Sequence, residues 1–278
     1  MSTRATADLQ PAPVFLAAML ALAAVALASP PAAAGEDDRL LFESCTILYQ
    51  ANRYDDAADC YRSLLDGGVR NGPAHANLAN AYMHLERHGE AVYHYRQAQL
   101  FLPRDSEVHG HLSRALAAAG LEREPPRPAA SRVLFFYDRL SPGELWGIAA
   151  ILNVILWGLL IIRLYRRGEI VTWAALVVFA GLLLFSGTAA VRTLELTTRP
   201  GAVVLSGTAV ARSGRDRSAG EMFRLTEGSG VTITARQADW VAVETEQGRR
   251  GWVEADVLGV IEYARLGAVG RDRDDAER

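Results

Sequence analysis

The stretches LWGIAAILNVILWGLLII (residues 145–162) and IVTWAALVVFAGLLLFSGTAAV (residues 170–191) decide the architecture of this chain. The first is an apolar run that is broken only by Asn153, and the second contains no charged residue. As helices they would reach about 27 and about 33 Å, against a bilayer hydrocarbon core of about 30 Å. A helix at the surface of a soluble protein keeps one polar face. We therefore predict two transmembrane helices, at residues 144–163 and 170–191.

The connector between the two apolar stretches predicts their orientation. It reads RLYRRGE (residues 163–169), and short loops rich in arginine stay in the cytoplasm. Residues 164–169 are then a cytoplasmic loop, and both flanking polar segments lie outside the cytoplasm. Residues 1–34 give the same topology, because Arg4, an apolar run and an alanine-rich cleavage site at residues 32–34 are typical of a signal peptide. An uncleaved anchor helix is the alternative.

Length and composition restrict the remaining possibilities. A chain of 278 residues can hold two modest domains beside the membrane segment. The net charge of −3 and the scattered basic residues argue against a nucleic-acid partner. Two cysteines exclude a disulfide-scaffold fold but permit one bridge.

Residues 36–121 are predicted to be helical and to repeat with a period of about 34 residues. At this spacing Ala57 aligns with Ala91 and Tyr61 with Tyr95. The motifs YDDA (residues 54–57) and GEAVYHY (residues 89–95), followed by Pro103, resemble the tetratricopeptide repeat (TPR). The resemblance implies two repeats plus a capping helix at residues 106–119, with the two tyrosines filling the gaps between repeats.

TPR geometry also implies a groove lined by the first helix of each repeat. Mapped onto this sequence, the groove contains Tyr49, Gln50, Asn80, His84 and Arg114. We expect Asn80 and Arg114 to hydrogen-bond an extended peptide or its carboxylate. A solvated polar face is the plainer alternative for any one of these residues.

Residues 122–143 are predicted to be a linker, in which Ser141 caps the first membrane helix and Pro142 occupies its first turn. From residue 201 the hydrophobic period changes to two. Short strands are expected at residues 202–205, 208–212, 231–234, 240–244 and 251–254. Glycine-rich turns separate them, which is typical of a small all-β barrel over residues 201–264. The charged tail at residues 265–278 is predicted to be disordered.

The β segment resembles a bacterial SH3-like (SH3b) domain. The likeness lies in TAVARSG (residues 208–214), LTEGSGVTI (residues 225–233), DWVAV (residues 239–243) and GRRGWV (residues 248–253). Arg215-Asp216 departs from the Pro-Ser that often follows the first motif. Trp240 and Trp252 are candidates for a ligand groove, with plain packing as the alternative.

The expected fold class is thus a multidomain membrane protein with an all-α TPR solenoid, a two-helix transmembrane hairpin and a small all-β SH3-like barrel. This order of modules, with LSPGELW (residues 140–146) leading into the first span, resembles the BatE family, the TPR component of the Bat (Bacteroides aerotolerance) operon. The resemblance implies a two-pass protein of the bacterial inner membrane with both domains in the periplasm.

By the same resemblance, the chain would be a non-enzymatic scaffold linked to aerotolerance and envelope stress. Its implied partners are membrane-anchored von Willebrand A-type proteins and a MoxR-like ATPase system. A peptidoglycan-binding anchor that acts through the SH3-like domain is the alternative function.

Other candidate chemistry is sparse. His84 and His88 are four residues apart and would share one face of a helix, but H-E-x-x-H is absent and no third ligand is evident. We expect no metal and no cofactor. Cys45 and Cys60 lie on the two helices of the first repeat, where either a disulfide or ordinary packing of Cys45 fits. No catalytic triad, P-loop or dinucleotide motif is present in the sequence, so no enzyme activity is expected.

Overall fold

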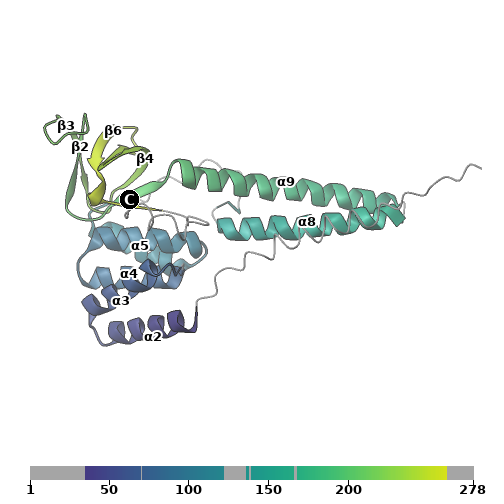
Figure 1. Cartoon of the computed structure of the whole chain (residues 1–278), viewed down its shortest axis with the longest axis horizontal. Helices are drawn as coiled ribbons and strands as arrows, with labels where there is room; N and C mark the ends of the chain where they lie inside the picture. Colours follow the sequence, from purple (N-terminus) through teal and green to yellow (C-terminus); the bar gives the residue numbers. More distant parts are fainter. Residues whose placement is uncertain (1–34, 70, 122–135, 138, 166–167, 262–278) are drawn as a thin grey trace, which may run out of the picture. The chain divides into compact units, whose positions relative to one another are not determined.

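The computed structural model describes residues 35–69, 71–121, 136–137, 139–165 and 168–261. The predicted signal peptide, most of the linker, part of the 164–169 loop and the charged tail lie outside these residues. The described part contains seven α-helices and one antiparallel sheet of seven strands (Figure 1). It divides into two units, one built from residues Glu144–Gly187 and one from the described residues before and after them.

Five consecutive helices of similar length form the first part of the chain. They are α2 (Glu36–Gln50), α3 (Tyr54–Asp66), α4 (Gly72–His84), α5 (His88–Phe101) and α6 (Ser106–Ala118). Each helix packs against the next. The ends of α2, α4 and α6 recur at one constant spacing in the sequence, and the starts of α3 and α5 have the same spacing. The helix bounds therefore follow the predicted repeat period.

The turns that follow α2, α4 and α6 repeat with the same period. Asn52, Glu86 and Gly120 adopt positive φ angles of 58°, 59° and 75°. In each turn the next backbone N–H returns to a carbonyl five residues earlier, which closes the helix end. The three bonds are Arg53 to Leu48, Arg87 to Tyr82 and Leu121 to Leu116. This turn geometry brings the next helix back against the one before it.

Two buried tyrosines connect neighbouring helices. The Tyr61 hydroxyl lies 2.8 Å from Thr46 Oγ1 and accepts a hydrogen bond from Asn77 Nδ2 at 3.1 Å. At the equivalent position of the next repeat, Tyr95 donates to Asn80 Oδ1 at 2.5 Å and lies 3.3 Å from His111 Nδ1. Both tyrosines are almost fully buried. Each ring therefore fills the space between one helix pair and the next, as the sequence predicted.

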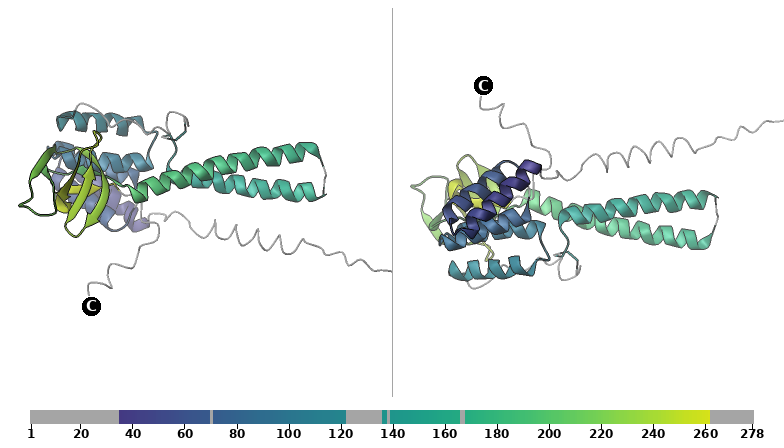
Figure 2. Two further views of the ribbon diagram at one scale, coloured as in Figure 1. Left: turned by 90° about the horizontal axis from the view of Figure 1, so that it is seen from above. Right: turned by 90° about the horizontal axis from the view of Figure 1, so that it is seen from below.

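The two long helices are α8 (Pro142–Tyr165) and α9 (Glu169–Thr198). Both are long and apolar enough to cross a membrane, and few of their residues are buried within the protein. Ile170, for example, is 85% exposed, which suits a surface in contact with lipid. They lie side by side in all views (Figure 2). Pro142 is the first residue of α8, as predicted, whereas α9 continues seven residues beyond the predicted span.

The last turns of α9 are bound to the segment that precedes α8. Arg192 donates hydrogen bonds from Nη1 to the carbonyls of Tyr137 and Leu140, and its guanidinium lies 5.3 Å from the Tyr137 ring centre. The buried Tyr137 donates its hydroxyl hydrogen to Glu195 Oε2 at 2.6 Å. These contacts join the two chain segments outside the apolar spans.

Substituting Tyr137→Phe is expected to loosen this junction. The change removes a hydrogen bond to a carboxylate and keeps the ring, so we expect a local loss of about 1 kcal/mol. Amide hydrogen exchange in the last turns of α9 should accelerate about fivefold. Tyr165→Phe, at a tyrosine that is 75% exposed, is the matched control. Equal exchange rates in both variants would contradict the prediction.

The β-domain consists of β1 (Gly201–Val204), β2 (Thr208–Arg212), β3 (Glu221–Thr226), β4 (Gly230–Gln237), β5 (Trp240–Glu244), β6 (Arg250–Glu254), the short 3-10 helix η1 (Ala255–Val257) and β7 (Leu258–Val260). The strands pair in the order β3-β2-β6-β5-β4-β1-β7. This pairing is that of one antiparallel sheet with β3 and β7 as its end strands, which confirms a small all-β domain in this part of the chain. Strands β3 and β7 were not predicted, because β3 buries one residue only and β7 is three residues long.

Strand β1 is buried on both faces and attaches the sheet to the helices. Ala202 and Val204 belong to the core of the sheet, whereas Val203 belongs to the core of the helices. Nearby, Gln97 of α5 donates a hydrogen bond to the Val260 carbonyl at 3.3 Å. A Cβ atom on Gly259 would lie 2.7 Å from the Tyr93 ring, so this position requires glycine. Helices and sheet therefore form one unit.

Candidate functional site

A groove runs across the helical repeats, where α2, α4 and α6 meet. It has a volume of about 290 Å³ and is lined by Tyr49, Asn80, Met83, His84, Tyr95, His111 and Arg114. Asn80 and Arg114 occupy equivalent positions of successive repeats, on α4 and α6. Repetition of the same helix pair therefore places these side chains along one surface.

Four of the five predicted groove residues line this groove: Tyr49, Asn80, His84 and Arg114. The fifth, Gln50, is exposed at the last turn of α2 and lies outside the lining. Three further lining residues, Met83, Tyr95 and His111, were not predicted from the sequence. The repeat alignment could have identified Met83, because it is the equivalent of Tyr49.

Aromatic rings order one end of the groove. His84 stacks on Tyr54 with ring centres 4.1 Å apart and planes 3° from parallel. Its Nε2 lies 3.2 Å from the Tyr49 hydroxyl. Burial raises the pKa of Tyr49 and of Tyr95, so both hydroxyls stay protonated at neutral pH. The groove thus offers hydroxyl and ring N–H groups close to the Arg114 cation.

A second hollow of about 170 Å³ continues the groove, since the two share Asn80, Tyr95 and His111. Its lining includes Asp105 and Glu107 at the start of α6. The Asp105 side chain accepts hydrogen bonds from the backbone N–H groups of Glu107 and Val108, at 2.8 and 3.2 Å, and so caps the helix. The whole groove therefore has a basic end at Arg114 and an acidic end at the start of α6.

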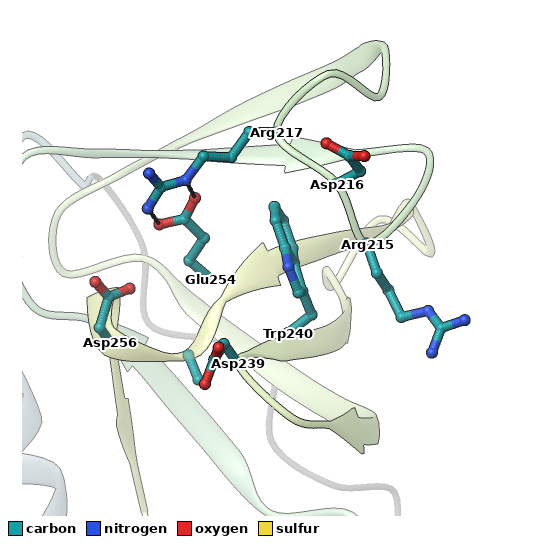
Figure 3. Close-up of a pocket in the computed structure, with 8 residues that line it drawn as sticks. Arg215, Asp216, Arg217, Asp239, Trp240, Glu254 and Asp256 are labelled. Atoms are coloured by element: carbon teal, nitrogen blue, oxygen red, sulfur yellow. Dashed lines mark hydrogen bonds and ion pairs between the residues drawn. The ribbon is translucent and has the colours of Figure 1, made fainter.

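Of the two tryptophans that were predicted to line a ligand groove of the β-domain, only Trp240 lines a cavity. Strands β5 and β6 pair Trp240 with Glu254 and Ala242 with Trp252, which places both rings on the outer face of the sheet. Trp240 lines a cavity of about 600 Å³, whereas Trp252 lies outside its lining (Figure 3). The other lining residues are Arg215, Asp216, Arg217, Asp239, Glu254, Ala255 and Asp256, which the sequence analysis did not identify as a site.

Cys45 and Cys60 form a disulfide that joins α2 to α3, with their Cα atoms 5.4 Å apart. Cys45 is also fully buried in the helical core. The two alternatives that the sequence left open therefore coincide at Cys45, which both packs in the core and forms the bridge.

The expectation that His84 and His88 share a helical face is wrong. α4 ends at His84 and α5 begins at His88, so a turn with the positive φ of Glu86 separates them. Among the described residues, no group of three or more His, Cys, Asp or Glu side chains is placed to hold a metal ion.

No family model, no curated protein and no solved structure matches this chain. Its function is therefore inferred from the residues and their geometry.

Proposed function

We propose that this protein is a non-enzymatic scaffold of the bacterial inner membrane, whose TPR-like helices bind a segment of a partner protein outside the cytoplasm. The observation that carries the proposal is the continuous groove that repeat-equivalent side chains line. Support for the membrane location comes from α8 and α9. The orientation rests on the arginine-rich connector and the signal-like N-terminal segment.

The groove suits an extended peptide with a negative group at one end. Arg114 is the permanent cation of the larger hollow, and guanidinium groups bind carboxylates through paired hydrogen bonds. The Asn80 carbonyl oxygen already accepts a hydrogen bond from Tyr95. The amide NH2 of Asn80 is therefore the group that it offers to a ligand, and an NH2 group binds a peptide carbonyl or a carboxylate.

The module order and its likeness to the BatE family suggest the partners. We propose membrane-anchored von Willebrand A-type proteins, acting with a MoxR-like ATPase system, in a Bat-type aerotolerance or envelope-stress complex. The SH3-like assignment of the β-domain belongs to the same proposal and is supported by the antiparallel sheet.

The test is recovery of partners with tagged full-length protein from mildly solubilised membranes. Arg114→Gln removes the groove cation, and loss of a charged hydrogen bond of about 1.5–3 kcal/mol predicts at least tenfold weaker binding. Arg39→Gln, at an exposed arginine of α2 outside the groove, is the matched control. We expect membrane proteins in stoichiometric amounts with wild type and control and their loss with Arg114→Gln.

The same experiment distinguishes the scaffold from the alternative function, a peptidoglycan anchor. Recovery of cell-wall fragments alone, unchanged by Arg114→Gln, would contradict a peptide-binding scaffold. It would instead favour a peptidoglycan anchor that acts through the β-domain.

A further inference from the structure

The long helix α8 carries one amide side chain in the middle of its apolar run. Asn153 is the ninth of the 18 residues from 145 to 162. With α8 in a membrane, as proposed above, it lies about 13 Å from either end of the run, near the centre of the hydrocarbon core. An amide without a hydrogen-bond partner is costly there, because no water can replace the partner. The surroundings of Asn153 must therefore supply one.

The rest of the described chain does not supply this partner. Within the described residues, the side chain of Asn153 makes no hydrogen bond, and neither does the indole N–H of Trp157, one turn later. The hydroxyl of Ser186 in α9 differs, because it donates to the Leu182 carbonyl at 2.6 Å and is satisfied within its own helix. Asn153 and Trp157 thus place two unpartnered polar groups on one face of α8.

Helix α8 has two stripes of residues with the alternating spacing of four and three that is typical of a coiled coil. The first stripe faces α9, since a Cβ atom on Gly181 of α9 would lie 3.5 Å from Leu152. Its members are buried or half-buried: Leu145, Ala149, Leu152, Leu156 and Leu159. The members of the second stripe are half-buried or exposed: Trp146, Ala150, Asn153, Trp157, Leu160 and Leu164. The amide therefore lies in the middle of a stripe that α9 leaves uncovered.

Lipid can cover the apolar members of the second stripe, because lipid tails are as apolar as leucine. Lipid tails offer no hydrogen bond to Asn153, so its partner must be a polar group of another helix at the same depth. A second copy of this chain meets that condition by symmetry. In a parallel pair related by a two-fold axis along the membrane normal, equivalent residues lie at equal depth. An amide is both donor and acceptor, so two Asn153 side chains can bond to each other.

We propose that α8 pairs with α8 of a second copy through the second stripe, with Asn153 bonded to Asn153 in the middle of the membrane. Ala150, one turn earlier, is small and lets the two backbones approach closely. The second stripe borders the stripe that faces α9, so the new contact continues the interface of the hairpin, and two hairpins form a bundle of four helices. Such a pair carries two helical grooves, and therefore two sites for a partner segment.

Sedimentation equilibrium of the full-length protein in density-matched detergent micelles measures this association. Asn153→Leu removes the amide and keeps the span apolar, and the loss of an interhelical hydrogen bond should raise the dimer dissociation constant about tenfold. Asn153→Gln keeps an amide and should retain most of the association. Ser186→Ala, at a polar residue that is already bonded within α9, is the matched control and should leave the dissociation constant unchanged.

Cysteine cross-linking in membranes identifies the surface. Oxidation of Ala150→Cys should join two chains, whereas Ile151→Cys, at an exposed residue on the far side of α8, should not. The native cysteines do not compete, because they are already bridged.

Three results would each overturn the proposal: a dissociation constant that Asn153→Leu leaves unchanged, equal cross-linking at positions 150 and 151, or a monomeric wild-type protein. In the last case the stripe would be covered by lipid, by another protein's helix, or by the N-terminal apolar run at residues 14–28, which lies outside the described residues. Retention in membranes after alkaline washing tests the proposed membrane location separately, so failure of the pairing and failure of that location are distinguishable.

Discussion

Below pH about 6.5, helices α4 and α5 are expected to lose stability, because two of their histidines must gain protons when the helices separate. His75 and His94 are largely buried, and their Nδ1 atoms lie 3.0 Å apart. Burial lowers the pKa of His75 to about 4. Burial also lowers the pKa of His94 well below its usual value, and nearby His75, Arg62 and Arg87 lower it further. A proton on His94 would therefore be buried and would face these cations, whereas a proton on His75 would be disfavoured by burial.

The sign of the effect follows from the direction of these shifts. Between about pH 6.5 and pH 4 the unfolded chain binds protons that the folded chain does not, so unfolding becomes easier as the pH falls. The stability is fully present above the unfolded pKa and is lost as the pH drops towards the folded pKa. For His75 alone the loss reaches on the order of 3 kcal/mol near pH 4. The pKa of His94 is lowered as well, so His94 adds to the loss of stability.

Amide hydrogen exchange of α4 and α5 in the full-length protein, corrected for the intrinsic pH dependence, measures this loss. The range from pH 7 to pH 5 is informative, since carboxylates titrate mainly below it. His75→Phe should reduce the pH dependence of exchange in α4 and α5, because the phenylalanine ring is apolar and does not bind a proton. His109→Gln, at an exposed histidine of α6, should retain the wild-type slope. A wild-type slope in His75→Phe would contradict this account.

The elements that the sequence predicted well are those whose signal lies in local repetition. Long charge-free runs identify α8 and α9 without knowledge of any neighbour. The period of the first five helices survives because each turn needs the same backbone geometry, as Asn52, Glu86 and Gly120 show. The repeat period of the sequence therefore predicts the spacing of these turns, even where individual side chains differ between repeats.

The elements that the sequence missed depend on contacts between distant segments. Strand β3 buries only Leu225, so its alternation is too weak to recognise. Val203 looks like any residue of a short strand, yet it belongs to the helical core because β1 packs on α5. The cavity of about 600 Å³ in the β-domain joins a loop, a strand start and a 3-10 helix, and β-strand pairing alone brings them together. Of its lining residues, the sequence identified Trp240 alone as a candidate for a ligand groove.

Removing the disulfide is expected to destabilise the first helix pair most. The bridge joins Cys45 to Cys60 across a sequence separation of 15, and a loop of that length corresponds to about 3 kcal/mol in the chain-entropy account. α2 is the first described helix and leaves Leu40 and Ile47 more than half exposed, so it has less packing than the inner helices. Loss of the bridge should therefore unfold α2 and α3 before α4 to α6.

Cys45→Ala/Cys60→Ala tests the bridge with little disturbance of the core. Alanine already occupies the position equivalent to Cys45, at the fully buried Ala79, so the smaller side chain suits this helix crossing. The variant and the reduced wild-type protein should show the same faster hydrogen exchange in α2 and α3, about 100-fold for a loss of about 3 kcal/mol. Exchange in the β-domain serves as the internal control. If the variant exchanged as slowly as the oxidised protein, packing of Cys45 alone would hold α2 in place, and the bridge would contribute nothing to the stability of the pair.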